Sequence, residues 1–202
     1  MKSKVRIPKF STSISLLLLC NFLFNNGYFS SQEQLVISAI PDQKPEKLNR
    51  MYKFLANELS KELNVPVKYV PVTNYTAAVT SFRTKSLDLV WFGGLTGVQA
   101  RIQTPGSKPL VQRDIDPKFH SLFISNHKSN LPVIKEVSDL KLLKGKRFTF
   151  GSESSTSGRL MPQHFLKTAG VNLSDFKGGS PGFSGSHDAT LALVKSGSFE
   201  AG

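Results

Sequence analysis

Short apolar runs alternate with longer amphipathic segments along the first half of the chain. The run LVISAI at residues 35–40 ends at a Pro-Asp pair and has the length of a buried strand. In the next segment leucine or methionine recurs every three or four positions, which is the apolar stripe of a helix. The same alternation then occurs twice more. We therefore predict strands at 35–40, 67–70 and 87–92 and helices at 46–64, 75–85 and 94–102.

This order of elements indicates an α/β fold. Strands that alternate with helices form parallel sheets with helices packed on their faces. In such sheets, ligands bind beyond the carboxyl ends of the strands. The segments that follow the three strand ends are 40–44, 72–75 and 91–96, and we expect them to face a ligand.

A second alternation follows a polar connection at residues 113–118. Before this connection we predict a strand at 109–112. After it we predict strands at 119–125 and 146–150 and helices at 139–144, 157–169 and 188–196, with a Gly/Ser-rich loop at 178–186. Residues 199–201 look like the start of another strand, which predicts a C-terminal truncation. The alternative is a natural short chain whose last helix packs alone. We expect a first α/β lobe at 32–115 and a second, incomplete lobe at 116–202.

The N-terminus has the pattern of a secretory signal peptide. A basic start, MKSKVRIPK, precedes an apolar run at residues 14–24, and we assign residues 1–31 to the signal. The run is shorter than the roughly 20 residues that span a bilayer, although a membrane-anchored N-terminus is the alternative. The only cysteine, Cys20, lies in this run. A lipid anchor at Cys20 is the less favoured reading, because Leu19 stands where lipoprotein signals have a small residue.

Composition predicts a soluble, folded protein with a basic surface. Apolar residues make up 39% of the 202 residues, which is enough for a packed core. The net charge is +12; without residues 1–31, 22 basic and 14 acidic residues leave +8. The bases are dispersed rather than interleaved with aromatic residues. They therefore favour attraction of a small anion to a cleft over binding of nucleic acid.

The stretch GSESSTSGRLMP at residues 151–162 places three hydroxyls between a predicted strand and a predicted helix. The first turn of a helix has free N–H groups and a partial positive charge. Hydroxyl donors added by Ser155, Thr156 and Ser157 would complete an anion site made of neutral groups. Helix capping alone is the alternative reading of these residues.

Two further residues are candidates for the same site. His187 begins the last predicted helix and could donate to an oxyanion, although its position alone favours an exposed or N-cap-like histidine. Tyr75 begins the second predicted helix and could offer a phenolic hydroxyl, with core packing as the alternative. Sequence motifs for a phosphate loop, a nucleophile elbow or a metal site are absent. We therefore expect no enzyme activity, no catalytic residue, no metal and no cofactor.

Taken together, the motifs resemble the phosphonate- and phosphite-type substrate-binding proteins of ABC importers. The resemblance rests on LVISAIPD, VPVTNYTAAV, LDLVWFGG, RFTFGSESSTSGRLMP and SGSHDATLALVKSG, in this order, and covers residues 34–202. The SAIPD and WFGG segments look like a branch labelled selenate-binding. The family fold is a type II periplasmic-binding-protein clamshell, in which the ligand lies between two lobes. Family members have about a hundred further residues, by this resemblance, which complete the second lobe and return to the first.

The resemblance also implies site residues and partners. It assigns the oxyanion to Ser155, Thr156, Ser157, Tyr75 and His187, whereas a second family tyrosine falls at Phe119. It implies a monomeric periplasmic protein that captures phosphonate or phosphite and delivers it to permease and ATPase subunits. The alternatives are a truncated, non-functional fragment of such a protein, or a binder of selenate, phosphate or sulfate.

Overall fold

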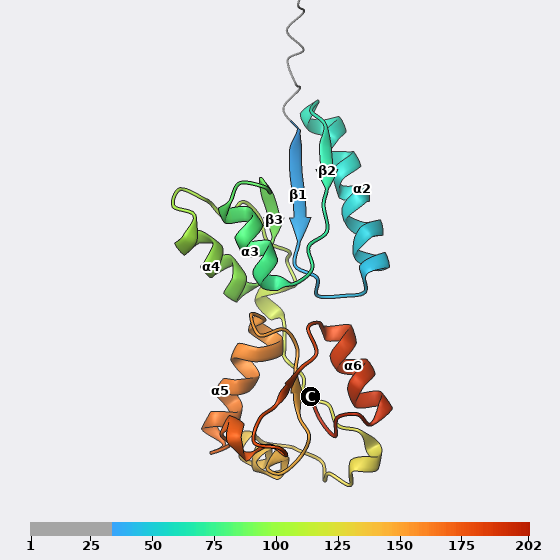
Figure 1. Ribbon diagram of the computed structural model, residues 1–202, viewed down its shortest axis with the longest axis vertical. Helices are drawn as coiled ribbons and strands as arrows, with labels where there is room; N and C mark the ends of the chain where they lie inside the picture. The colour runs from blue at the N-terminus through green and yellow to red at the C-terminus, as the bar shows by residue number, and fades with distance from the viewer. Residues whose placement is uncertain (1–33) are drawn as a thin grey trace, which may run out of the picture. The chain divides into compact units, whose positions relative to one another are not determined.

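The computed structural model describes residues 34–202. The predicted signal peptide and Cys20 lie outside the described residues. Within 34–202, no helix combines the length and the apolar character that crossing a membrane requires. We call the elements from β1 to α4 the N-terminal half and those from η1 to α6 the C-terminal half (Figure 1).

The N-terminal half contains a parallel sheet with the strand order β2-β1-β3. In register, Ile37 of β1 lies between Tyr69 of β2 and Leu89 of β3. Both crossovers are helical, as parallel pairing requires. The elements are β1 (Leu35–Ala39), α2 (Pro45–Leu63), β2 (Val67–Tyr69), α3 (Tyr75–Arg83), β3 (Leu89–Trp91) and α4 (Gly94–Gln103).

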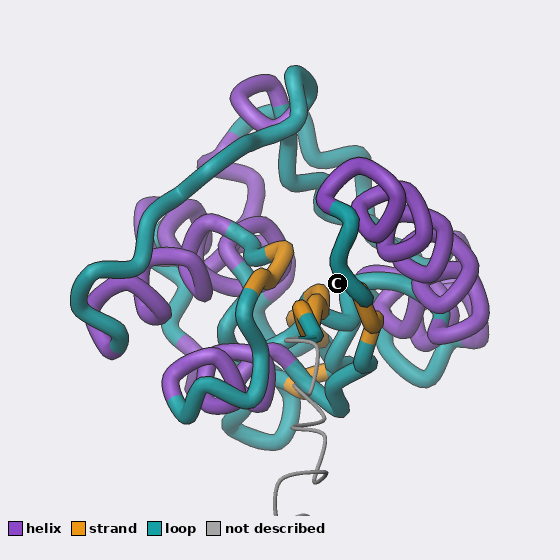
Figure 2. Tube along the Cα trace, turned by 90° about the horizontal axis from the view of Figure 1, so that it is seen from above, coloured by secondary structure: helices purple, strands orange, loops and turns teal. Residues whose placement is uncertain are grey.

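The two faces of this sheet are buried by different helices. Ile37, Ala39 and Tyr69 pack with Ala56 of α2, whereas Ile40 packs with Tyr75 and other residues of α3. Pro45 lies in the first turn of α2, and the Asn74 side chain accepts a hydrogen bond of 2.7 Å from the Ala77 N–H at the start of α3. Figure 2 shows the short strands surrounded by helices and loops. The strand and helix predictions for this half are confirmed to within three residues.

The C-terminal half has a smaller parallel sheet of two short strands, β4 (Thr149–Phe150) and β5 (Gly182–Phe183). Its core is a cluster that includes Leu143, Phe148 and Leu166. The helices are η1 (Asp116–Lys118), η2 (His127–Ser129), η3 (Val137–Leu143), η4 (Thr156–Leu160), α5 (Met161–Thr168), η5 (Leu173–Asp175) and α6 (His187–Ser196).

Several predictions for residues 109–202 were wrong. Residues 109–112 form no strand, and 119–125 contribute only an antiparallel bridge of Ser125 to Ala201. An apolar run becomes a strand only where an adjacent backbone segment forms hydrogen bonds with its N–H and C=O groups. Such bonds begin at Ile124, whose N–H donates to the Gly202 carbonyl at 2.9 Å. At the start of η3, the Asp139 carboxylate accepts the N–H groups of Lys135 and Glu136.

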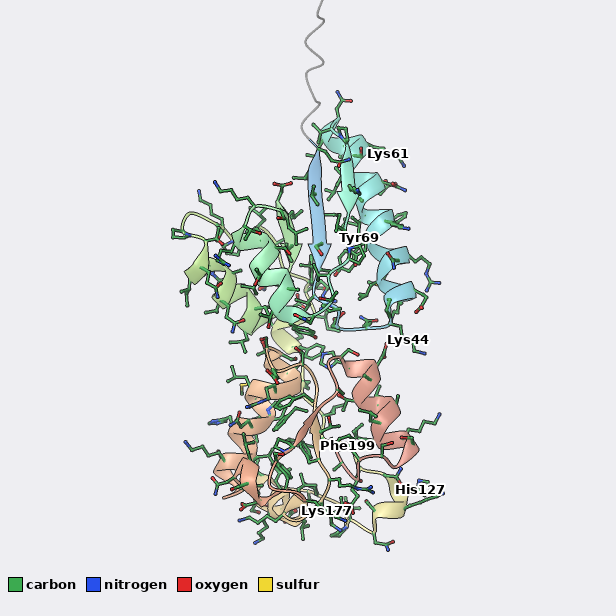
Figure 3. All side chains as sticks on the ribbon, in the orientation of Figure 1. Lys44, Lys61, Tyr69, His127, Lys177 and Phe199 are labelled. Carbon is green, nitrogen blue, oxygen red and sulfur yellow. The ribbon has the colours of Figure 1, made fainter. Side chains whose placement is uncertain are left out.

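One strand was missed, because it lies in the Gly/Ser-rich segment at 178–186. Gly182 pairs with Thr149, and a Cβ at this glycine would lie 2.5 Å from the Phe199 ring. Phe199 therefore occupies the space that a side chain on β5 would need, within the C-terminal half (Figure 3). The strand depends on this close approach rather than on β propensity.

Candidate functional site

The hydroxyl triplet begins a helix, as predicted, but its first turn is a π-helix. Ser155 is the N-cap of η4, and α5 continues from Met161. A π-turn widens the backbone and is frequent at functional sites. The Ser155 Oγ accepts a hydrogen bond of 2.9 Å from the Gly158 N–H, and the residue is only 3% exposed. The capping reading is therefore correct for Ser155.

The structure explains why residue 158 is a glycine, which the sequence alone did not. The Gly151 N–H donates to the Gly158 carbonyl at 2.8 Å, which closes the loop that carries the triplet. A Cβ at Gly158 would lie 3.1 Å from the Ser155 Oγ and 3.4 Å from the Gly151 Cα. The missing side chain lets these two backbone segments touch, and so it fixes where the hydroxyls lie.

Thr156 contacts the N-terminal half. Its Oγ1 accepts a hydrogen bond of 2.7 Å from the Leu95 N–H, in the first turn of α4. A Cβ at Gly94 would approach this oxygen to 3.1 Å, so the glycine gives the threonine access to the helix end. An oxygen that accepts from a helix N–H has its own hydrogen polarised for donation. Thr156 therefore joins two helix N-termini, those of α4 and η4.

Tyr75 is the first residue of α3 and is almost fully buried, at 2% exposure. Burial raises the pKa of its phenol and the Asp42 carboxylate adds to the rise, while a hydrogen bond with Ser155 opposes it. The phenol therefore stays protonated and available as a donor at neutral pH. Next to it, the hydroxyls of Thr76 and Ser154 lie 3.4 Å apart.

His187 is the first residue of α6, behind the N-cap Ser186. Its backbone N–H donates to the Asp42 carbonyl at 3.1 Å, and the Asp188 carboxylate accepts the Lys44 N–H at 2.9 Å. Figure 3 labels Lys44 at the loop that leads into α2. The start of α6 therefore contacts the loop after β1, and the histidine ring lies 6.4 Å from the Phe119 ring.

The five predicted site residues form two groups. Ser157 and His187 line one cavity of about 230 Å³, together with Phe119, Phe150 and Thr190. Tyr75, Ser155 and Thr156 do not line this cavity. The two groups are joined through the triplet itself, since Ser155, Thr156 and Ser157 are consecutive.

Positive charge contributes little to this site. Arg159 is the nearest base in the sequence, but its guanidinium lies over the rings of Phe150 and Phe183, at 4.8 and 5.5 Å. Burial also lowers the Arg159 pKa. In residues 34–202, no group of three His, Cys, Asp or Glu side chains could hold a metal ion. The arrangement offers hydroxyls, helix N–H groups and one imidazole, which is chemistry suited to an anion.

Sequence reasoning missed two contributors, Asp42 and the N–H of Leu95. Asp42 lies within 40–44, one of the segments expected to face a ligand, but the sequence analysis did not name it as a site residue. The Leu95 contact had no sequence signal, because a backbone group carries none.

The chain is similar in sequence and structure to proteins of one transporter family. Residues 37–202 match the model of the family described as "ABC transporter, phosphonate, periplasmic substrate-binding protein". The chain is 58% identical over 180 residues to a probable ABC transporter phosphite binding protein, PhnD1, of Prochlorococcus marinus strain MIT 9301. It is 27% identical over 161 residues to the phosphonates-binding periplasmic protein of Escherichia coli K12.

The fold class is confirmed by solved structures. The structure of PhnD1 in complex with methylphosphonate superposes with a TM-score of 0.83 at 59% identity, over 85% of this chain and 63% of that one. A phosphonate-transporter binding protein of Pseudomonas aeruginosa superposes at 0.69 with 19% identity, which shows the fold alone. The chain covers 61% of the length of PhnD1 and 46% of the E. coli protein.

Proposed function

Because the chain belongs to the family of periplasmic phosphonate-binding proteins of ABC transporters, we propose that the protein captures a tetrahedral oxyanion for import. Phosphite or a phosphonate is the first candidate ligand. This choice is supported by the names of the relatives and by the methylphosphonate complex of PhnD1. The proposed protein is periplasmic, soluble and monomeric, delivers its ligand to a permease with its ATPase, and performs no chemistry.

One observation carries this proposal: the hydroxyl triplet lies where helix ends from both halves of the chain meet. Thr156 bonds to the first turn of α4, and Ser155 caps η4 by accepting the Gly158 N–H. Helix N-termini and polarised hydroxyls together bind an anion without burying an opposite charge. We assign ligand contacts to Tyr75, Ser155, Thr156, Ser157 and His187. A ligand that bridges these donors would favour the arrangement in which the two halves contact each other.

The test is calorimetry of phosphite and methylphosphonate binding to the protein expressed from its complete gene. Changing Ser155, Thr156 and Ser157 together to alanine should abolish measurable binding. Thr168→Ala is the control, because it removes an exposed hydroxyl that bonds only the preceding helical turn, at His164. Unchanged affinity in the triple variant would refute the site. Absence of binding in the unmodified protein would refute the ligand class.

A further inference from the structure

The side chain of Asp188 makes a hydrogen bond to a residue of the other half of the chain. Asp188 follows His187 in the first turn of α6, and its carboxylate accepts the Lys44 N–H at 2.9 Å. The adjacent His187 N–H donates to the Asp42 carbonyl at 3.1 Å. Two consecutive residues of the C-terminal half therefore bond the loop that leads from β1 into α2.

The N-cap of α6 is provided by Ser186 and not by the Asp188 carboxylate. The Ser186 Oγ accepts the Ala189 N–H at 3.2 Å, and the Ser186 carbonyl accepts the Thr190 N–H at 3.1 Å. An acid in the first turn is favoured by the partial positive charge of the helix end. The Asp188 carboxylate is therefore stable at the start of α6, while its hydrogen bond goes to the start of α2.

The helix α2, in contrast, begins without a side-chain cap of its own. A capping box needs an acceptor on the N-cap side chain and another on the third helical residue, which reaches back to the N-cap N–H. In α2 these positions are Lys44 and Lys47, whose ammonium groups can only donate. The Asp188 carboxylate accepts the Lys44 N–H in their place. The start of α2 is therefore completed by a residue of the C-terminal half.

We propose that Asp188 is a positioning residue, whose bond to the start of α2 stabilises the contact between the two halves and fixes the position of His187. The proposal rests on the proposed function, since it concerns the same site. His187 lines the cavity with Ser157, and the bond that holds the next residue can form only when the two halves are in contact. Without this bond a smaller fraction of the protein is competent to bind, so the apparent affinity for the ligand falls.

The experiment measures methylphosphonate affinity by calorimetry in the protein expressed from its complete gene and in two variants of residue 188. Asp188→Ala removes the acceptor and should weaken binding by about threefold to tenfold. Asp188→Asn keeps an oxygen that can accept the Lys44 N–H, so it should restore most of the affinity. Glu46→Ala is the matched control, because it removes an exposed acid from the first turn of α2 and should leave the affinity unchanged.

Each outcome separates the two proposals. If the unmodified protein binds neither phosphite nor methylphosphonate, the proposed function fails. If it binds them and Asp188→Ala binds as tightly, or Asp188→Asn loses as much affinity as Asp188→Ala, the role of Asp188 is refuted. Variants that fail to fold are replaced by amide hydrogen exchange of the unmodified protein, measured by NMR. There, the Lys44 N–H should exchange more slowly with methylphosphonate bound, and an equal rate in the free protein would overturn the proposal.

Discussion

At the scale of single residues, the three consecutive hydroxyls have different environments. Ser155 is buried and caps η4, Thr156 bonds across to α4, and Ser157 faces a cavity. The three hydroxyls are therefore equivalent in the sequence motif but have different contacts in the structure. The sequence predicted that these residues begin a helix, but their separate partners depend on the tertiary structure.

The Thr156 hydroxyl can be tested by an isosteric change. Thr156→Val keeps the shape but leaves the Leu95 N–H without its acceptor. An unsatisfied polar group should weaken methylphosphonate binding by about tenfold to a hundredfold. Thr156→Ser restores the oxygen and should restore most of the affinity, as measured by calorimetry. Loss of affinity in Thr156→Ser but not in Thr156→Val would mean that the methyl group, rather than the hydroxyl, is required.

At the scale of elements, the predictions succeeded where local pattern and tertiary pairing agree. The three strands and three helices of the N-terminal half alternate along the sequence and are neighbours in space. Those in the C-terminal half depend on distant partners. Residues 119–125 have strand-like composition without a continuous neighbour, whereas Gly182 and Phe183 form a strand because Thr149 and Phe150 lie beside them. Pairing of this kind cannot be predicted from the periodicity of one segment.

The first turn of α4 provides a matched pair of glycines. Gly94→Ala would put a Cβ 3.1 Å from the Thr156 Oγ1, whereas Gly97→Ala meets its nearest neighbour, Arg101, at 3.5 Å. Gly97→Ala should stabilise the helix by about 0.5–1 kcal/mol and leave oxyanion affinity unchanged. Gly94→Ala should displace the threonine and weaken binding. Calorimetry and thermal unfolding of both variants test this, and equal affinities would show that the contact is unimportant for binding.

Adjacent leucines in η3 test where the core of the C-terminal half lies. Leu143 is 1% exposed and belongs to the buried cluster, whereas Leu142 is 38% exposed. Leu143→Ala should lower the free energy of unfolding by about 2–5 kcal/mol, because it removes apolar contacts and leaves a cavity. Leu142→Ala should cost about 0.5 kcal/mol or less. Urea unfolding of the two variants measures the difference, and similar costs would contradict the assigned core.

At the scale of the whole molecule, the carboxyls divide into two kinds. Several have a pKa below the ordinary value because N–H groups or bases hold the charged form; they are Asp116, Asp139, Asp175 and Glu200. Asp42 has a raised pKa because burial penalises its charge. The first kind stabilises the fold, whereas the second carries a cost at neutral pH.

The carboxyls with a lowered pKa should make the protein less stable in acid. A carboxyl with a lowered folded-state pKa binds fewer protons in the native state, so its contribution is complete above the unfolded pKa, 3.8 for Asp and 4.5 for Glu. This contribution to stability is lost as pH falls through the lower pKa values that these carboxyls have in the folded state. Asp42 changes in the opposite sense: protonation removes its cost as pH falls.

The contribution of a single carboxylate can be measured at Glu200. Its carboxylate accepts the Arg147 N–H at 3.0 Å and lies near the side chains of Lys146 and Arg147. Glu200→Gln should unfold at a lower temperature than the unmodified protein at neutral pH, and the difference should shrink toward zero as pH falls through the lowered folded-state pKa of Glu200. Asp42→Asn should instead unfold at a higher temperature at neutral pH, again with a difference that vanishes in acid. Calorimetric unfolding across this range measures both. A constant difference at every pH would mean that packing, rather than charge, is responsible.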